Sequence, residues 1–312
     1  MKNYWRNVMV LALAAPVMGS AMAQGPAAVD KPQQAPPTAQ PLNTAPAAVA
    51  PVAPQFESLA KKGPNGKIVR LEGVVDILAF ENNKLIDQPT REKCKPFILA
   101  WLADVDQLMI DNLDFVLKIE PADGQPGLLD NIDVDDHVKL QQMSQMMSQL
   151  MSAGPLSNHL ELKGALTRDQ SGLNQQITSD YLQQTMNEIM AENPEKPDGA
   201  GDAEKAKKDR INNLTRFLYA LSCKDPISSY HRIAADSAAN IDTVVASLKL
   251  EGEQAKAAAA MVPAIKAAKS KTDKFNAVRK LIGILKFDQQ RAFLTKAQEL
   301  APVTDPLANK WS

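Results

Sequence analysis

The stretch from His137 to Met151 holds side chains that could bind a soft metal ion. Four methionines fall within the nine positions from Met143 to Met151, and His137 lies just upstream. Thioether sulfurs favour copper(I). Methionine is also used at surfaces that bind varied apolar partners, and it fills irregular gaps in helix cores. The same residues therefore fit a copper site, a client-binding surface or a core face.

Helical periodicity favours the core interpretation. At 100° per residue the apolar side chains fall within an arc of roughly 140°, and they are Leu140, Met143, Met146, Met147, Leu150 and Met151. A copper site would leave this helix only two leucines for packing. We therefore predict core packing, and we keep as the alternative an apolar client surface formed by Met143, Met147, Leu150 and Met151.

An acidic cluster precedes the methionine helix and offers harder ligands. Asp133 and His137 are spaced i,i+4, so on a helix they share a face and could hold a divalent ion. The spacing does not match a calcium-binding loop, and aspartates are expected near a helix start as caps. We predict capping here, with Asp133 and His137 as the only metal candidates.

The other histidines, His159 and His231, have no catalytic motif around them. The chain contains no G-x-S-x-G, HExxH, CxxCH or glycine-rich phosphate loop. The sequence accordingly predicts no catalytic residue and no cofactor. Paired carboxylates can still meet from distant helices, so a pocket with converging carboxylates or histidines would favour an enzyme.

The N-terminus predicts export. Lys2 and Arg6 precede an apolar run over 8–17, and small residues end at Ala23. This order is typical of a secretory signal peptide, residues 1–23, cleaved after Ala23. The run is shorter than the ~20 residues that span a membrane. We expect a periplasmic or secreted protein with no transmembrane segment in the mature chain, and no nucleic-acid partner.

Export would place the two cysteines in an oxidising compartment. Cys94 and Cys223 are the only cysteines of the chain, and an oxidising compartment favours joining them. We predict a disulfide between them. The alternative is two buried thiols that behave as small hydrophobic side chains.

The rest of the chain must supply the helices that position these residues. Residues 24–54 are rich in proline and alanine and predict a disordered linker. The body predicts an all-α fold, a multi-helix bundle of antiparallel hairpins, divided into subdomains 55–192 and 211–312 by a loop at 193–210. Helices are expected at 91–119, 133–152, 168–192, 204–222, 226–249, 253–270, 273–286 and 288–300.

Three short stretches resemble a family motif. "LKLEGEQ" (248–254), "LKFDQQRAFL" (285–294) and "LTRDQ" (166–170) each open a predicted helix. They look like the L-x-L-T-x-x-Q elements of the LTxxQ family of periplasmic stress proteins, the Spy-like chaperones. Glu251 stands in place of the motif threonine, and Arg291 in place of its second glutamine. The resemblance implies an all-α hairpin that binds unfolded or stress-related partners without catalysis.

Together these features favour an exported, non-enzymatic helical binding or scaffold protein, with a chaperone-like or stress-related role. Its partner would be another protein or an unfolded client. The alternatives are a periplasmic metal-binding or metal-responsive helical protein, and an enzyme without a recognisable motif.

Overall fold

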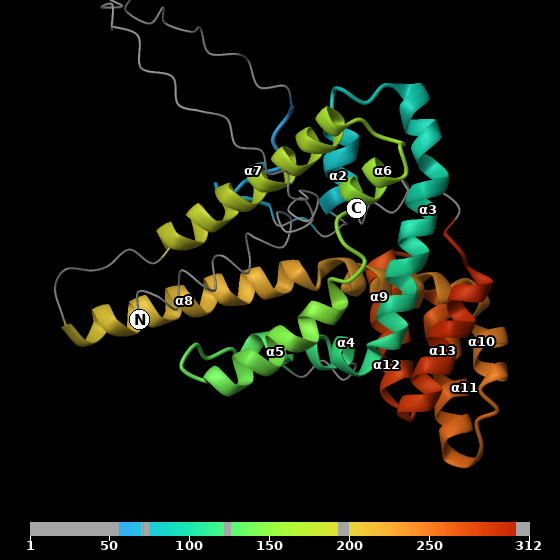
Figure 1. Cartoon of the computed structure of the whole chain (residues 1–312). Coiled ribbons are helices and arrows are strands. Elements are labelled where there is room, and N and C mark those ends of the chain that lie inside the picture. The colour runs from blue at the N-terminus through green and yellow to red at the C-terminus, as the bar shows by residue number, and fades with distance from the viewer. Residues whose placement is uncertain (1–55, 70, 72–74, 122–125, 193–199, 304–312) are drawn as a thin grey trace, which may run out of the picture. The chain divides into compact units, whose positions relative to one another are not determined.

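Helices are the only extended regular elements that the computed structural model describes, over residues 56–69, 71, 75–121, 126–192 and 200–303 (Figure 1). Two isolated β-bridges join Phe56 to Asn83 and Lys62 to Ile68. The predicted all-α helical bundle is confirmed for this part of the chain. The predicted signal peptide and linker lie outside the described residues. None of the described helices combines the length and the apolar character that a membrane span requires.

The helices follow one another with short connections. In chain order they are α2 (Val75–Asn82), α3 (Gln88–Asp111), α4 (Leu113–Ile119), the 3-10 helix η2 (Leu128–Asn131), α5 (His137–Leu150), α6 (Leu156–Leu162), α7 (Arg168–Glu192), α8 (Ala200–Ser222), α9 (Lys224–Ser237), η3 (Ala238–Asn240), α10 (Ile241–Ser247), α11 (Gly252–Ala267), α12 (Lys271–Gly283) and α13 (Phe287–Leu300).

Local hydrogen bonds explain where the helices depart from prediction. The helix predicted at 91–119 is interrupted after Asp111, where Asn112 leaves the helical conformation (φ −111°, ψ 28°) and its side-chain amide donates to the Leu108 carbonyl at 2.9 Å. Pro96 lies inside α3 without ending it. Helix α8 begins at Ala200, so the second part of the loop predicted at 193–210 is helical. Helix α7 spans the predicted residues 168–192.

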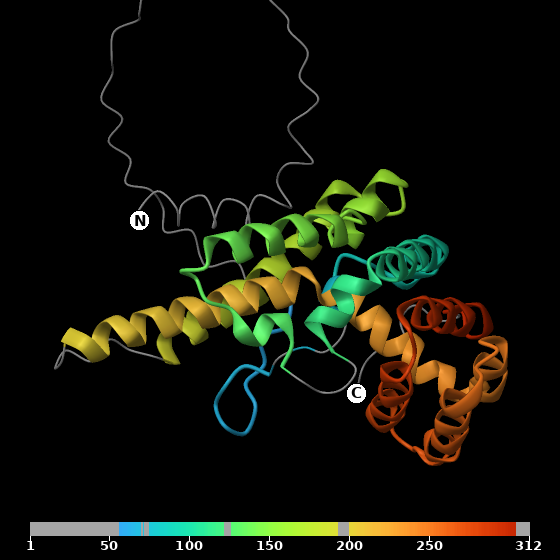
Figure 2. The same ribbon diagram turned by 90° about the horizontal axis from the view of Figure 1, so that it is seen from below.

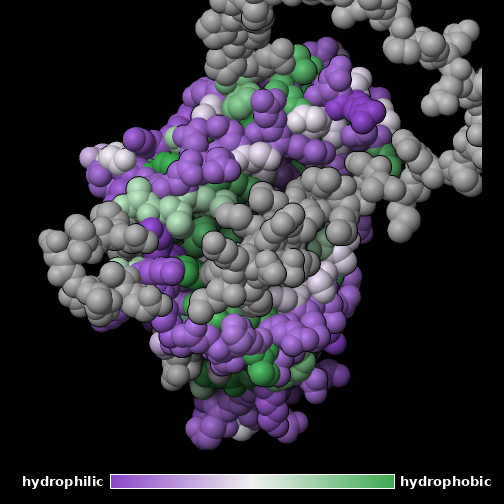
Figure 3. Space-filling model, turned by 60° about the vertical axis from the view of Figure 1, so that its left-hand side comes forward, coloured by the Kyte–Doolittle hydropathy of each residue, from purple (hydrophilic) through white to green (hydrophobic). Residues whose placement is uncertain are grey.

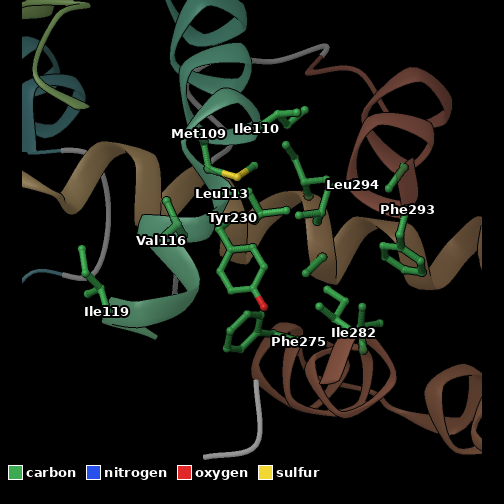
Figure 4. Packing of buried hydrophobic residues seen from close by; sticks show 14 of the residues in the cluster. Met109, Ile110, Leu113, Val116, Ile119, Tyr230, Phe275, Ile282, Phe293 and Leu294 are labelled. Atoms are coloured by element: carbon green, nitrogen blue, oxygen red, sulfur yellow. The ribbon is translucent and has the colours of Figure 1, made fainter. Parts of the chain in front are cut away.

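Helix α9 lies at the centre of the C-terminal helices. It packs against α3, α4, α8, α12 and α13, and α10 to α13 gather around it (Figure 2). The largest hydrophobic cluster includes Tyr230 of α9, Met109 of α3, Val116 of α4 and Phe293 of α13 (Figure 4). The division into two subdomains stays a prediction, although this cluster draws residues from both sides of the predicted boundary.

Two smaller clusters hold the N-terminal helices together. One packs Phe80 of α2, Trp101 of α3 and Leu160 of α6, and the Trp101 ring N–H donates to the Gly154 carbonyl at 3.1 Å. The other packs Ile177 and Tyr181 of α7 against Leu59, Ile68 and Val75. These helices therefore have apolar contacts of their own beside the main cluster.

The methionine face of α5 lies in the main cluster. Met143 is 1% exposed, Met147 5% and Leu150 2%, whereas Met151 is 39% exposed. This burial agrees with the core interpretation. It contradicts the client surface of Met143, Met147, Leu150 and Met151, because three of the four side chains face the interior. Asp136 caps the helix by accepting the Lys139 N–H at 2.9 Å.

The predicted disulfide is wrong. Cys94 and Cys223 are both free and buried, and they belong to different clusters. Met109 and Ile110 are the α3 residues in the cluster of Cys223, and Met109 lies about 22 Å along the helix from Cys94. Burial raises the pKa of the Cys223 thiol to about 12 and raises that of Cys94 as well. Both thiols stay protonated and act as small core residues.

Substitutions at Met147 test the core role of this face. Met147→Ala should lower the unfolding free energy by roughly 2–5 kcal/mol, because it leaves a cavity in a packed cluster. Met147→Leu conserves volume and should cost less than about 1.5 kcal/mol. Urea unfolding of the two variants measures both values. A Met147→Ala variant as stable as the unchanged protein would contradict the core assignment.

Candidate functional site

A cleft of about 810 Å³ opens among α4, η2, α7, α8, α9 and α12. Its size falls in the range of small-ligand and side-chain-binding pockets. Apolar side chains make up much of its lining, and they include Ile119, Leu129, Tyr181, Ile189, Phe217, Leu221, Ile227 and Phe275. Figure 3 brings forward the side on which α7 and α8 lie in Figure 1, and hydrophobic residues reach the surface there between hydrophilic ones.

Side chains of two helices, α8 and α12, form two walls of the cleft. From α8, Asn213, Phe217 and Leu221 line it at intervals of four residues, and Arg216 and Ala220 lie beside them. Residues three and four apart share a helix face, so these side chains form one stripe. The same rule places Thr272, Phe275, Asn276 and Arg279 of α12 on the second wall.

A histidine and a carboxylate meet at one edge. His231 of α9 contacts the Glu120 carboxylate at the end of α4 through Nε2, and both side chains are partly exposed. The His231 ring lies 4.2 Å from the Phe275 ring centre, at an angle of 42°. Tyr230 packs edge-on against the Phe275 ring, with the ring centres 5.6 Å apart. The aromatic contacts fix the imidazole in place.

Two arginines bind backbone carbonyls of residues that line the cleft. Arg279 of α12 donates to the Pro121 carbonyl, with Nε at 2.7 Å. Arg216 of α8 donates to the carbonyls of Leu129 and Asp130, at 2.9 and 2.7 Å. These acceptors are neutral, so both arginines keep their positive charge beside the cleft while they hold its shape.

Gly127 lies close to the end of α4. A Cβ atom at this position would lie 1.9 Å from the Ile119 carbonyl oxygen, which no side chain can tolerate. The Gly127 N–H donates to the Asp130 carboxylate at 2.9 Å. Glycine is therefore required here for space, although its φ of −72° is ordinary.

Two aspartates with raised pKa lie at the starts of α2 and α9. Burial, and secondarily the charge of Asp76, raise the pKa of Asp225 to about 7, and the neighbouring Lys224 partly opposes this. Burial also raises the pKa of Asp76, although its carboxylate accepts the Leu156 N–H at 2.9 Å. Lys224 lines the cleft, so Asp225 lies next to its rim.

The metal candidates lie elsewhere. Both Asp133 and Asp135 form ion pairs with Lys208 of α8, at 3.0 and 2.6 Å. The Asp135 backbone N–H and then Lys208 lower the pKa of Asp133. His137 begins α5, with Asp136 as the cap. Within the described ranges no three histidine, cysteine or acidic side chains gather as metal ligands would.

Sequence reasoning found only part of this site. The sequence does not group Glu120, Arg216, His231 and Arg279, because they come from four separate helices or helix ends. His159 lies on α6 outside the cleft, where burial first and Lys163 second lower its pKa. Phe217 and Leu221, two apolar residues spaced four apart in α8, are a signal in the sequence that could have pointed to this wall.

Comparisons of the chain with known protein families, curated proteins and solved structures find no match.

Asp225 predicts a stability that depends on pH. Its folded pKa is above its unfolded value of 3.8, so the folded state holds the proton more tightly. The protonated Asp225 carboxyl therefore contributes its full share to the free energy of unfolding below pH 4, and this share is lost as pH rises toward 7. The loss is at most about 4 kcal/mol, and smaller because the side chain keeps some solvent contact.

The variant Asp225→Asn should remove this pH dependence. Its unfolding free energy should match that of the unchanged protein at pH 4 and exceed it at pH 8, as measured by urea unfolding. Asp242→Asn is the control, because Asp242 is also in the first turn of a helix but is exposed and paired with Lys266. Equal pH profiles for Asp225→Asn and the unchanged protein would refute the assignment.

Proposed function

We propose that this chain is an exported, non-enzymatic helical binding protein that holds an apolar segment of a partner protein in the cleft. One observation carries this proposal: the cleft is lined mainly by apolar side chains, and Arg216 and Arg279 at its border keep its shape through bonds to backbone carbonyls. A cleft held open in this way pays little conformational cost when a partner enters.

The place of action is also a proposal. The charged, apolar and small-residue order of residues 1–23 supports export with cleavage after Ala23. The two free cysteines give no support for an oxidising compartment. They do not contradict one either, because buried thiols with a raised pKa react slowly with oxidants in any compartment.

The relation to the LTxxQ family likewise stays a proposal. In its support, Glu251 stands at the N-cap of α11, and α13 begins within "LKFDQQRAFL". Thr167 and Gln170 of "LTRDQ" form a reciprocal cap, with the Thr167 N–H at 2.9 Å from Oε1 of Gln170. Gln254 and Gln289 bond to each other through their amides, at 2.8 and 3.2 Å.

A second candidate function is an enzyme that uses Glu120 and His231. A carboxylate that orients an imidazole in a cleft is a common arrangement for general acid–base catalysis. His231→Gln separates the two functions, because it removes the base while it leaves the apolar lining intact. Catalysis would be abolished by this change, whereas binding of an apolar segment would persist.

The variant Phe217→Ser tests the cleft. Phe217 lines the cleft from α8, and a phenylalanine that becomes fully buried contributes roughly 1.5–3 kcal/mol. Phe217→Ser should therefore weaken the binding of an uncharged leucine–glutamine peptide at least tenfold in fluorescence anisotropy. Leu162→Ser is the control, because Leu162 is 87% exposed and outside the cleft. Equal losses in both variants, or no binding by the unchanged protein, would refute the proposal.

A further inference from the structure

We propose that the segment bound in the cleft is acidic as well as apolar, so that the partner is a protein segment with leucine-like side chains beside glutamates or aspartates. This inference rests on the proposed function and specifies its partner. The charges around the cleft carry it, and they are independent of the apolar lining.

Basic side chains outnumber acidic ones in the lining. Arg216, Lys224 and Arg279 are basic, and Glu120 and Asp130 are acidic. Both acidic groups already have donors within the protein: Glu120 contacts His231, and Asp130 accepts the Gly127 N–H at 2.9 Å.

The second wall extends this positive charge beyond the cleft. Helix α12 carries Lys271, Lys274, Arg279 and Lys280, with Asp273 as its only acidic residue. Asp273 is held at the start of the helix, where the Ser270 hydroxyl donates to it at 2.6 Å. The three lysines lie outside the cleft lining, and the charges of Lys271 and Lys274 act on the Asp236 carboxylate of α9, so Arg279 is the basic residue that α12 presents to the cleft.

The arrangement favours a protein segment over a nucleic acid. A nucleic acid carries a negatively charged phosphate at every nucleotide, and it would place these charges against the apolar side chains of Ile119, Leu129 and Ile227. An acidic amphipathic segment turns leucines toward these residues and carboxylates toward Lys224 and α12. Charge complementarity of this kind affects partner choice and association rate more than total affinity.

Three synthetic peptides of equal length and leucine pattern test the inference on the full mature chain. Their polar positions hold glutamate, glutamine or lysine, and binding is measured by fluorescence anisotropy at 20 mM and 500 mM salt. We expect the glutamate peptide to bind about tenfold more tightly than the lysine peptide at low salt, with the ratio falling toward one at high salt. A single-stranded oligonucleotide that displaces the glutamate peptide would overturn the inference.

Charge variants of the cleft locate the effect. Lys224→Gln should weaken the binding of the glutamate peptide about threefold and leave the binding of the glutamine peptide unchanged. Lys256→Gln is the matched control, because Lys256 is an exposed residue of α11 paired with Glu253. Asn276→Asp adds a negative charge at an exposed lining position. It should weaken the binding of the glutamate peptide and strengthen the binding of the lysine peptide.

The outcomes separate the two proposals. Equal binding of the three peptides, all weakened by Phe217→Ser, would overturn the acidic preference and leave the binding function standing. A failure of all three peptides to bind would overturn both. An effect of Lys256→Gln as large as that of Lys224→Gln would also overturn the inference, because the preference would then come from the net charge of the protein.

Discussion

A buried ion pair between α3 and α9 is the interaction on which the rest of the structure depends. Arg232 donates to one oxygen of the Asp106 carboxylate, and the Ser229 hydroxyl donates to the other. Asp106 is 3% exposed and Arg232 6%. Removing two charges from water is costly, and the cost is offset only when the charges meet in good geometry. The pair therefore favours one register of α9 against α3, because a shift would separate Asp106 from Arg232 and leave Arg232 with only its longer contact to Asp236, 4.0 Å away on the same helix.

Helix α9 transmits this constraint to the cleft. Its core side carries Tyr230, Ile233 and Ala234, and Ala234 and Ala235 allow neighbouring helices to approach closely. Ile227 and His231, which share a helix face with Tyr230 and Ala234, line the cleft. The residues that line the cleft are thus one turn or less from those that fix the core, so the stability of the core and the shape of the cleft depend on the same helix.

The parts of this structure that depend on local pattern could be predicted from the sequence. The apolar period of α5 predicted that Met143 and Met147 face a core, and the polar and apolar pattern of α7 predicted its bounds. The break at Asn112 could not be predicted, because it depends on a side-chain bond to the Leu108 carbonyl within a continuous apolar stripe. The disulfide prediction used the compartment alone, which says nothing about the distance between Cys94 and Cys223. The cleft was missed because Glu120, Arg216, His231 and Arg279 meet only through the packing of helices far apart in the sequence.

A double-mutant cycle on Asp106 and Arg232 tests the central role of α9 most directly. Urea unfolding would be measured for Asp106→Leu, Arg232→Met and the double variant. The account predicts that each single change costs roughly 3–5 kcal/mol, because it leaves an uncompensated buried charge, and that the double change costs much less than their sum. Costs that add within about 0.5 kcal/mol would contradict the account, because the two residues would then be acting independently.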